Sequence, residues 1–250
     1  MPPDHSCKSK LYEKAQSLLG LPTGDIFNVL DFGCGCGELL GSLEANINKD
    51  STLIGIDSDA TSLSKAKSSF PSVDFRQDNF VDSLDFEDSS FDLVVTIDTI
   101  ECIPDKSALL KEIHRVLKPG GQVLALHWDW DTQTYNVASK DLARRAVAAF
   151  SDWKQSWMEC ADGQIGRKLW GLFEGSGLFQ GKSDTFSLIE TDYQPGRYGY
   201  DRAQDLAVLV DEGGFDRSDY QNFCKELSES YASGQYHYTL TSFIYHGRRK

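Results

Sequence analysis

Short hydrophobic runs alternate with longer amphipathic stretches through the first half of the chain. The runs are rich in β-branched and aromatic residues and end at Gly, Asp or Asn, a pattern that predicts buried strands. The stretches between them carry apolar residues at helical spacing. We predict strands at residues 28–32, 52–57, 73–77, 91–97 and 122–128, and helices at 8–19, 37–47, 60–70 and 105–117. Such alternation is typical of a parallel sheet built from strand–helix–strand units.

The second half carries longer helical patterns around two further strands. We predict these strands at 185–190 and 237–245, and helices at 136–159, 164–175, 201–213 and 216–232. The fold class is therefore α/β, a Rossmann-like, doubly wound, seven-stranded and mostly parallel sheet. We expect one domain over residues 1–250, with a cofactor-binding core at 26–128 and helical lid insertions at 129–180 and 192–235.

The composition limits the partners. The formal net charge of -13 opposes binding to nucleic acid or anionic membranes, because such binding needs Lys and Arg to neutralise phosphates. No apolar run approaches the roughly 20 residues that span a bilayer, so we expect no membrane span and a cytoplasmic protein. The six cysteines are scattered without zinc-type or redox spacing, which favours reduced thiols and no metal site.

A glycine-rich turn, DFGCGCG (31–37), follows the first predicted strand and precedes a helix. Glycines at this place let the backbone approach a ligand closely. A dinucleotide fingerprint would read G-x-G-x-x-G, whereas this turn reads G-x-G-x-G with Asp31 immediately before it. S-adenosylmethionine has no phosphate and carries a positive sulfonium and amino group, which Asp31 could offset.

Further polar residues follow the next predicted strands. Asp57 ends the second strand, where a carboxylate can accept both hydroxyls of a ribose. Asp78, Asn79 and Phe80 follow the third strand and suit an amide-edge hydrogen bond and an apolar contact to adenine. The fourth strand ends in residues 97–98, which should pass beneath the methionine part of the cofactor.

Taken together, these motifs resemble the class I S-adenosylmethionine-dependent methyltransferases, in the branch of the ubiquinone and menaquinone methyltransferases. The matching stretches are VLDFGCGCGE, IGIDSD, RQDNF, SFDLVVTIDTIECIPD and LKPGGQVLAL, within residues 26–128. The resemblance implies an antiparallel last strand and S-adenosyl-L-methionine as cofactor, with S-adenosyl-L-homocysteine as product. The implied cofactor-binding residues are Asp31, Gly33, Cys34, Gly35, Asp57, Ser58, Asp78, Asn79, Phe80, Ile97 and Asp98. The chain departs from the family at Cys102, where many relatives carry His.

The segment after the fifth strand, HWDWDTQTY (127–135), should face the transferred methyl group, because ligands bind beyond the carboxyl ends of parallel strands. We take Asp129 as the first candidate for a general base and His127 as the second, although a buried core histidine is an equal alternative. Aromatic side chains should wall the substrate, although helix packing explains many of them equally well. The candidates are Trp128, Trp130, Tyr135 and Tyr198.

The predicted reaction is methyl transfer to a nucleophilic N, O or C atom of a small-molecule substrate, by a monomer or homodimer. An acidic, aromatic cavity would suit an amine or another cation. One alternative is an arsenite methyltransferase, which would use thiolates such as those of Cys102, Cys160 and Cys224. Another is a catalytically silent methyltransferase-like binding subunit.

Overall fold

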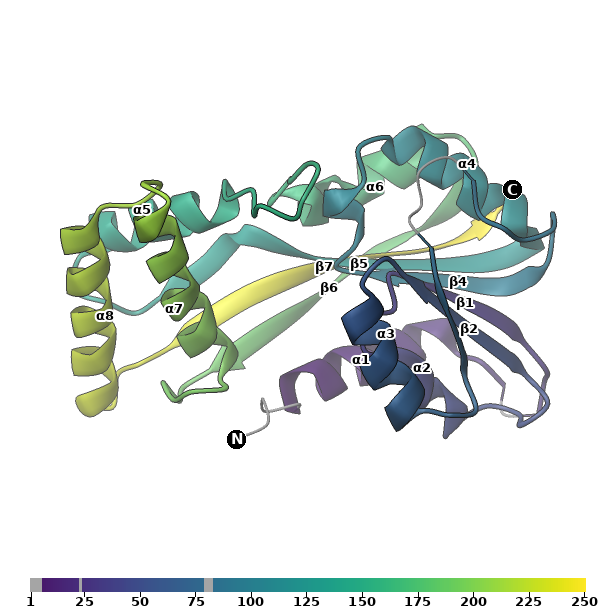
Figure 1. Ribbon diagram of the computed structural model, residues 1–250, viewed down its shortest axis with the longest axis horizontal. Helices are drawn as coiled ribbons and strands as arrows, with labels where there is room; N and C mark the ends of the chain where they lie inside the picture. The colour runs from purple at the N-terminus through teal and green to yellow at the C-terminus, as the bar shows by residue number, and fades with distance from the viewer. Residues whose placement is uncertain (1–5, 23, 79–82) are drawn as a thin grey trace.

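A seven-stranded sheet in the order β3-β2-β1-β4-β5-β7-β6 forms the centre of the protein (Figure 1). The structure is a computed structural model that describes residues 6–22, 24–78 and 83–250. The strands are β1 (Asn28–Phe32), β2 (Thr52–Asp57), β3 (Asp74–Gln77), β4 (Phe91–Ile97), β5 (Leu117–Tyr135), β6 (Phe179–Glu190) and β7 (Tyr238–Arg249). Neighbouring strands among β1 to β5 pair in parallel, whereas β7 runs antiparallel between β5 and β6. The predicted fold class is confirmed.

Helices cover both faces of the sheet. In Figure 1 α1, α2 and α3 lie below it, α4 and α6 lie above it, and α5, α7 and α8 gather at the left-hand end. The helices are α1 (Ser6–Leu19), α2 (Glu38–Glu44), α3 (Ala60–Ser69), α4 (Lys106–Val116), α5 (Lys140–Ser151), α6 (Ile165–Gly175), α7 (Tyr198–Asp211) and α8 (Arg217–Ala232), with a short 3-10 turn, η1 (Ile100–Cys102). No helix in the described ranges is long and apolar enough to cross a membrane.

The central strands read as continuous hydrophobic runs because the helices bury both of their faces. Val29 of β1 and Leu93 of β4 pack into the hydrophobic cluster that includes α1, α2 and α3. Leu30 of β1, the next residue along, packs with α4 and α6 in a second cluster. This alternation fixes the register of β1 against β4, since a slip of one residue would exchange the two faces.

Strand β5 is longer than the predicted strand at 122–128. It continues to Tyr135 because residues beyond Trp128 still pair with β7, with Asp129 opposite Thr241 and Tyr135 opposite Tyr238. The lid insertion predicted from residue 129 therefore begins with strand. The sequence did not predict this extension, because residues 129–135 are mostly polar and form no hydrophobic run.

The helix predicted at 136–159 is shorter in the structure, where only α5 at Lys140–Ser151 forms. The side chain of Ser139 accepts a hydrogen bond from the amide of Leu142, which caps the start of the helix. Beyond the end of α5, residues 152–164 form an irregular segment that crosses back to α6. The segment brings Trp157 and Met158 over the carboxyl ends of the parallel strands.

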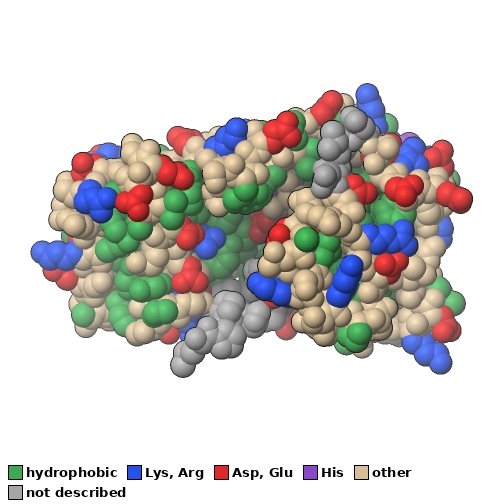
Figure 2. Space-filling view, in the orientation of Figure 1, with side chains coloured by type: hydrophobic (Ala, Val, Ile, Leu, Met, Phe, Trp, Pro, Cys, Tyr) green, Lys and Arg blue, Asp and Glu red, His purple; other side chains and the backbone are tan. Residues whose placement is uncertain are grey.

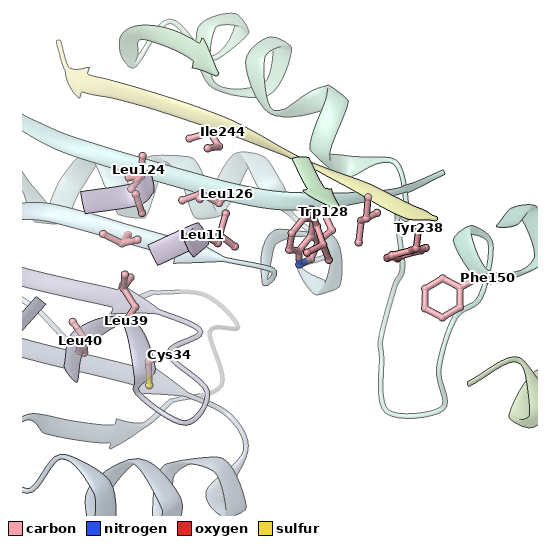
Figure 3. Packing of buried hydrophobic residues seen from close by; sticks show 14 of the residues in the cluster. Leu11, Cys34, Leu39, Leu40, Leu124, Leu126, Trp128, Phe150, Tyr238 and Ile244 are labelled. Atoms are coloured by element: carbon pink, nitrogen blue, oxygen red, sulfur yellow. The ribbon is translucent and has the colours of Figure 1, made fainter. Parts of the chain in front are cut away.

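The extended ends of β5 and β7 carry the cluster of α5, α7 and α8. Tyr135 of β5 packs against Phe223 of α8 at 5.2 Å between ring centroids and against Tyr238 of β7 at 4.7 Å. Figure 3 shows Trp128 of β5 and Tyr238 of β7 on this part of the sheet with Phe150 of α5 beside them, whereas Leu11 and Leu39 lie toward the parallel half. The hydrophobic core thus continues from the parallel half of the sheet into the second half.

Candidate cofactor and acceptor site

The glycine turn between β1 and α2 is held against β2. The amides of Gly33 and Cys34 both donate to the carbonyl of Ile56, at 2.9 and 3.0 Å. Gly33 has φ +77, and a Cβ there would collide with the side chain of Thr99. Gly35 has φ +52. The turn thus requires glycine for its dihedral angles at both positions, and for space at Gly33.

Asp57 is positioned by the same turn at the end of β2. Its Oδ2 accepts from the amide of Gly35 at 2.8 Å, and its Oδ1 accepts from the amide of Asp59 at 2.9 Å. Each carboxylate oxygen has two lone pairs, so capacity remains for hydroxyl donors. Asp59 in turn caps α3, because its side chain accepts from the amides of Thr61 and Ser62.

A cleft of about 730 Å³ lies beside this turn, a volume suited to a nucleoside-sized ligand. Figure 2 shows a hollow between the two halves of the molecule, with hydrophobic and charged side chains around it. Six of the predicted cofactor residues line the cleft: Gly33, Gly35, Asp57, Ser58, Ile97 and Asp98. The structure thus brings together residues from β1, β2 and β4 that lie far apart in the sequence.

A smaller cavity adjoins the cleft and shares Gly33, Gly35, Ile97 and Asp98 with it. It adds two more predicted residues, Asp31 and Cys34, together with Leu11, Tyr12, Leu39 and Trp128. The Asp31 side chain is 2% exposed. Burial, with a contribution from the charge of Asp57, raises the pKa of Asp31 to about 7. The carboxylate is thus poised to ionise when a positive charge arrives.

Asp98 has an unusual backbone at the end of β4. It adopts φ 54, a rare conformation for a residue other than glycine. Its amide donates to the carbonyl of Leu126, and its Oδ1 accepts from the amide of Trp128, both at 3.0 Å. These two bonds to β5 hold Asp98 between the cleft and the smaller cavity.

The predicted adenine contacts are only partly described. Asp78 follows β3, and its amide donates to the carbonyl of Asp57 at 3.0 Å. This bond joins the end of β3 to the end of β2, where the ribose is expected. Asn79 and Phe80 lie outside the described residues.

His127 is fully buried rather than open to a substrate. Its Nδ1 lies 2.8 Å from the carbonyl oxygen of Trp128, while its Nε2 has no hydrogen-bond partner and lies 4.0 Å from Oε2 of Glu101. His127 therefore has the position of a buried core histidine, and any proton that it exchanges with a substrate would have to pass through a neighbouring side chain.

Asp129 does not fit the predicted role of general base. Its side chain is fully buried, and Arg167 of α6 donates to it from Nε and Nη2, both at 2.6 Å, and from the backbone amide at 3.1 Å. These donors stabilise the charged carboxylate and occupy its oxygens. Alternation along β5 turns Asp129 toward α6, whereas Trp128 belongs to the cluster on the other face.

The predicted aromatic residues have different surroundings. Trp128 lines the smaller cavity, and Trp130 lines a third cavity beside η1. Tyr198 of α7 lies 5.5 Å from Trp128 and is stacked with Trp130 at 6.4 Å, measured between ring centroids. Tyr135 packs between β5 and α8, because its ring contacts Phe223, and its hydroxyl donates to Gln133.

Sequence reasoning missed two charged residues beside the third cavity. They are Glu101, which directly precedes Cys102 in the sequence, and Arg202, which lies in a helix without a recognisable motif. The signal for Glu101 was its place four residues after the end of a parallel strand. No local signal distinguished Arg202 from other arginines.

The thiols do not form the set that the arsenite alternative requires. In the described ranges, no three side chains among His, Cys, Asp and Glu are grouped so that they could hold a metal ion. Cys102 lies by the cofactor cleft, and Cys160 donates to the carbonyl of Glu101 at 3.3 Å, whereas Cys224 belongs to α8. Burial, together with the charge of Glu101, raises the pKa of Cys102 to about 12, which disfavours its thiolate.

The residues present fit S-adenosylmethionine. Asp57 offers free lone pairs to ribose hydroxyls, Gly33 and Gly35 bring backbone to the cleft, and Asp31 provides a buried carboxylate for a cationic group. A pyrophosphate would instead place two negative charges close to Asp31 and Asp57.

Comparison with known proteins supports this fit. Residues 25–198 match the methyltransferase domain family. The chain is 32% identical to the demethylmenaquinone methyltransferase of Lactococcus lactis, over 48% of this chain and 46% of that protein. It is 37% identical to a ubiquinone biosynthesis O-methyltransferase of Pseudomonas syringae, over 38% of this chain and 41% of that protein. These matches span less than half the length of either relative.

Solved structures share the fold. The YcgJ protein of Bacillus subtilis superposes with a TM-score of 0.59 and 18% identity, over 94% of this chain and 97% of that one. An S-adenosylmethionine-dependent methyltransferase from Mesorhizobium loti gives a TM-score of 0.54 and 18% identity, over 93% and 96%. With the sheet order, the cleft and the family match agreeing, the chain belongs to the methyltransferase domain family, and its cofactor is S-adenosyl-L-methionine.

Proposed function

We propose that this protein transfers a methyl group from S-adenosylmethionine to a nucleophilic atom of a small metabolite. The observation that supports this most strongly is the continuity of the site. The cleft beside Asp57 and the smaller cavity beside Asp31 share Ile97 and Asp98 at the end of β4. A cofactor held by the two carboxylates would therefore extend past the end of β4 toward β5.

The bound cofactor supplies a methyl group on a positively charged sulfur, so the protein mainly aligns the acceptor and excludes water. Asp57 and the backbone of the glycine turn hold the ribose end, and the Asp31 carboxylate offsets positive charge. Trp128 and Tyr198 form an apolar wall next to the end of β4. The segment that carries Trp157 and Met158 lines the outer side of the cleft.

A small acceptor is favoured over a polymer. The relatives named above act, by their names, in quinone biosynthesis, and the net charge of -13 opposes a nucleic acid. The arsenite alternative is disfavoured because Cys102 and Cys160 interact without a third thiol, and no three metal-binding side chains are grouped in the described ranges. A silent binding subunit is disfavoured because the carboxylates and glycines of the cofactor site are all in place.

Calorimetry with S-adenosylhomocysteine tests the cofactor assignment. We expect low-micromolar binding, weakened by about 1–3 kcal/mol in Asp57→Ala, the scale of leaving ribose hydroxyls unpaired. Asp50→Ala, at an exposed position outside the cleft, is the matched control and should bind like the wild type. Absence of binding heat with the wild type would refute the proposal, and equal affinity in Asp57→Ala would refute the ribose contact.

A further inference from the structure

A third cavity lies next to the cofactor cleft and shares Met158 with it. It lies between η1, β5, the end of α5 and the start of α7, and the irregular segment 152–164 contributes half of its lining residues. Its lining includes Glu101, Trp130, Phe150, Ser151, Trp153 and Arg202. We call it the Glu101–Arg202 cavity. With a volume of about 50 Å³ it has room for a ligand no larger than the smallest amino acids, and it combines an aromatic wall with one acidic and one basic side chain.

Glu101 supplies a carboxylate that can accept further hydrogen bonds. The residue is 7% exposed, and its Oε2 accepts from the indole of Trp130 at 3.2 Å. Its Oε1 makes no hydrogen bond within the described ranges. Oε2 also lies 4.0 Å from the unpartnered Nε2 of buried His127. Burial raises the pKa of Glu101, which makes it a better proton acceptor than an exposed carboxylate.

Arg202 supplies the positive charge of this cavity. Its guanidinium packs over the rings of Phe150 and Tyr198, with the central carbon 5.9 and 5.2 Å from the ring centroids. Nη2 forms an ion pair with Asp205 at 2.8 Å, whereas Nε is buried and finds no hydrogen-bond partner among the described residues. The hydroxyl of Ser151, in the same cavity wall, is also buried and unpartnered. Buried polar atoms that lack protein partners point to a polar ligand.

We propose, resting on the function proposed above, that the Glu101–Arg202 cavity is the acceptor site for a small amino acid-like zwitterion whose amino nitrogen is methylated. Arg202 binds the carboxylate, because a guanidinium presents paired donors to such a group. Glu101 binds the amino group. A ligand with only one of the two charges would leave either the buried Glu101 without a cation or the buried Nε of Arg202 without an acceptor, which is unfavourable.

Methylation of the amino group takes one proton transfer and one displacement at carbon. The ammonium of the acceptor gives one proton to Glu101, which becomes neutral, and the amine keeps a free lone pair. That lone pair forms the new nitrogen–carbon bond to the methyl group, while the carbon–sulfur bond breaks and its electron pair remains on sulfur. The products are an N-methylated ammonium and neutral-sulfur S-adenosylhomocysteine. The buried Nε2 of His127 stands next to Glu101 as a second site for the proton.

The first experiment identifies the acceptor class. A metabolite extract, supplemented with the twenty protein amino acids, is incubated with the wild type and methyl-labelled cofactor, and labelled products are identified by mass spectrometry. We expect an N-methylated product that carries a carboxylate. A labelled product that lacks either group overturns the inference. Binding of S-adenosylhomocysteine with no labelled product also overturns it, whereas absence of that binding refutes the proposed function.

Variants test the two charged residues separately. Arg202→Met should raise KM for the amino acid identified at least about tenfold, the scale of a charged hydrogen bond, while S-adenosylhomocysteine affinity stays unchanged. Arg202→Lys, which keeps the charge, should recover part of this loss. Arg144→Met, at an exposed position on α5, is the matched control. An unchanged KM in Arg202→Met overturns the carboxylate contact.

Glu101→Gln should lower kcat about a hundredfold and remove the rise of kcat with pH, because the proton acceptor is lost. A readout without turnover comes from tryptophan fluorescence, since Trp130 and Trp153 line the cavity. The same amino acid, added with S-adenosylhomocysteine, should change the emission of the wild type and of Arg144→Met but not of Arg202→Met. A kcat and pH profile unaffected by Glu101→Gln, or an equal fluorescence change in all three proteins, overturns the inference.

Discussion

The buried carboxylate of Asp31 should make the protein lose stability between acid and neutral pH, a loss that a variant without the carboxylate does not share. The substitution Asp31→Asn keeps the shape of the side chain and removes its ionisable group. Asp31 is 2% exposed, and burial together with Asp57 raises its pKa from the ordinary value near 4 to about 7. In the folded protein without cofactor, the charged form is therefore disfavoured.

The size of the effect follows from the two pKa values. A rise of about 3 units corresponds to about 4 kcal/mol, at about 1.4 kcal/mol per unit. Because the pKa is higher in the folded state, the folded protein holds a proton that the unfolded chain has released between about pH 4 and pH 7. The associated stability is fully present below about pH 4 and is lost as the pH rises through 7. Asp31→Asn has no such loss.

Urea unfolding of the cofactor-free protein between pH 4.5 and 8.5 measures this difference. The free energy of unfolding of Asp31→Asn should rise relative to the wild type by about 3 kcal/mol between pH 4.5 and pH 8.5, whatever constant offset the amide introduces. Asp50→Asn, at an exposed site, should show no such pH-dependent gain. A difference for Asp31→Asn that does not vary with pH would show that Asp31 does not titrate in this range.

Two further substitutions test the framework of the site. Gly33→Ala should abolish S-adenosylhomocysteine binding in calorimetry and destabilise the fold more than Gly213→Ala does; both glycines have φ +77, but only at Gly33 would a Cβ collide with Thr99. The prediction fails if the two variants lose equal stability. Arg167→Met should lower the free energy of unfolding by about 3 kcal/mol, because it leaves the buried carboxylate of Asp129 without its ion pair. Denaturation of this variant with Asp129→Asn added should recover part of the loss, and a wild-type midpoint for Arg167→Met would contradict the reasoning.

Most of the parallel half of the sheet could be predicted from the sequence. Strands β1, β2 and β4 begin and end at the predicted residues, because burial on both faces imposes an uninterrupted hydrophobic run on each. The cofactor cleft was legible for a related reason. The strands are parallel, so polar residues at their carboxyl ends meet at one edge of the sheet. Gly33, Asp57 and Asp98 are brought together in this way.

The acceptor side depended on the tertiary structure. Nothing near Asp129 indicates that Arg167, 38 residues later, would occupy it, and nothing links Glu101 to Arg202 before α7 folds back over the end of β5. The extension of β5 also depends on pairing with β7, more than 100 residues away. By itself the sequence determined the parallel half of the sheet and most of the residues that line the cleft, because strands buried on both faces leave a local hydrophobic pattern. The tertiary structure decided which charges are paired and which remain available, because a charged side chain takes its partner from whatever distant segment packs beside it.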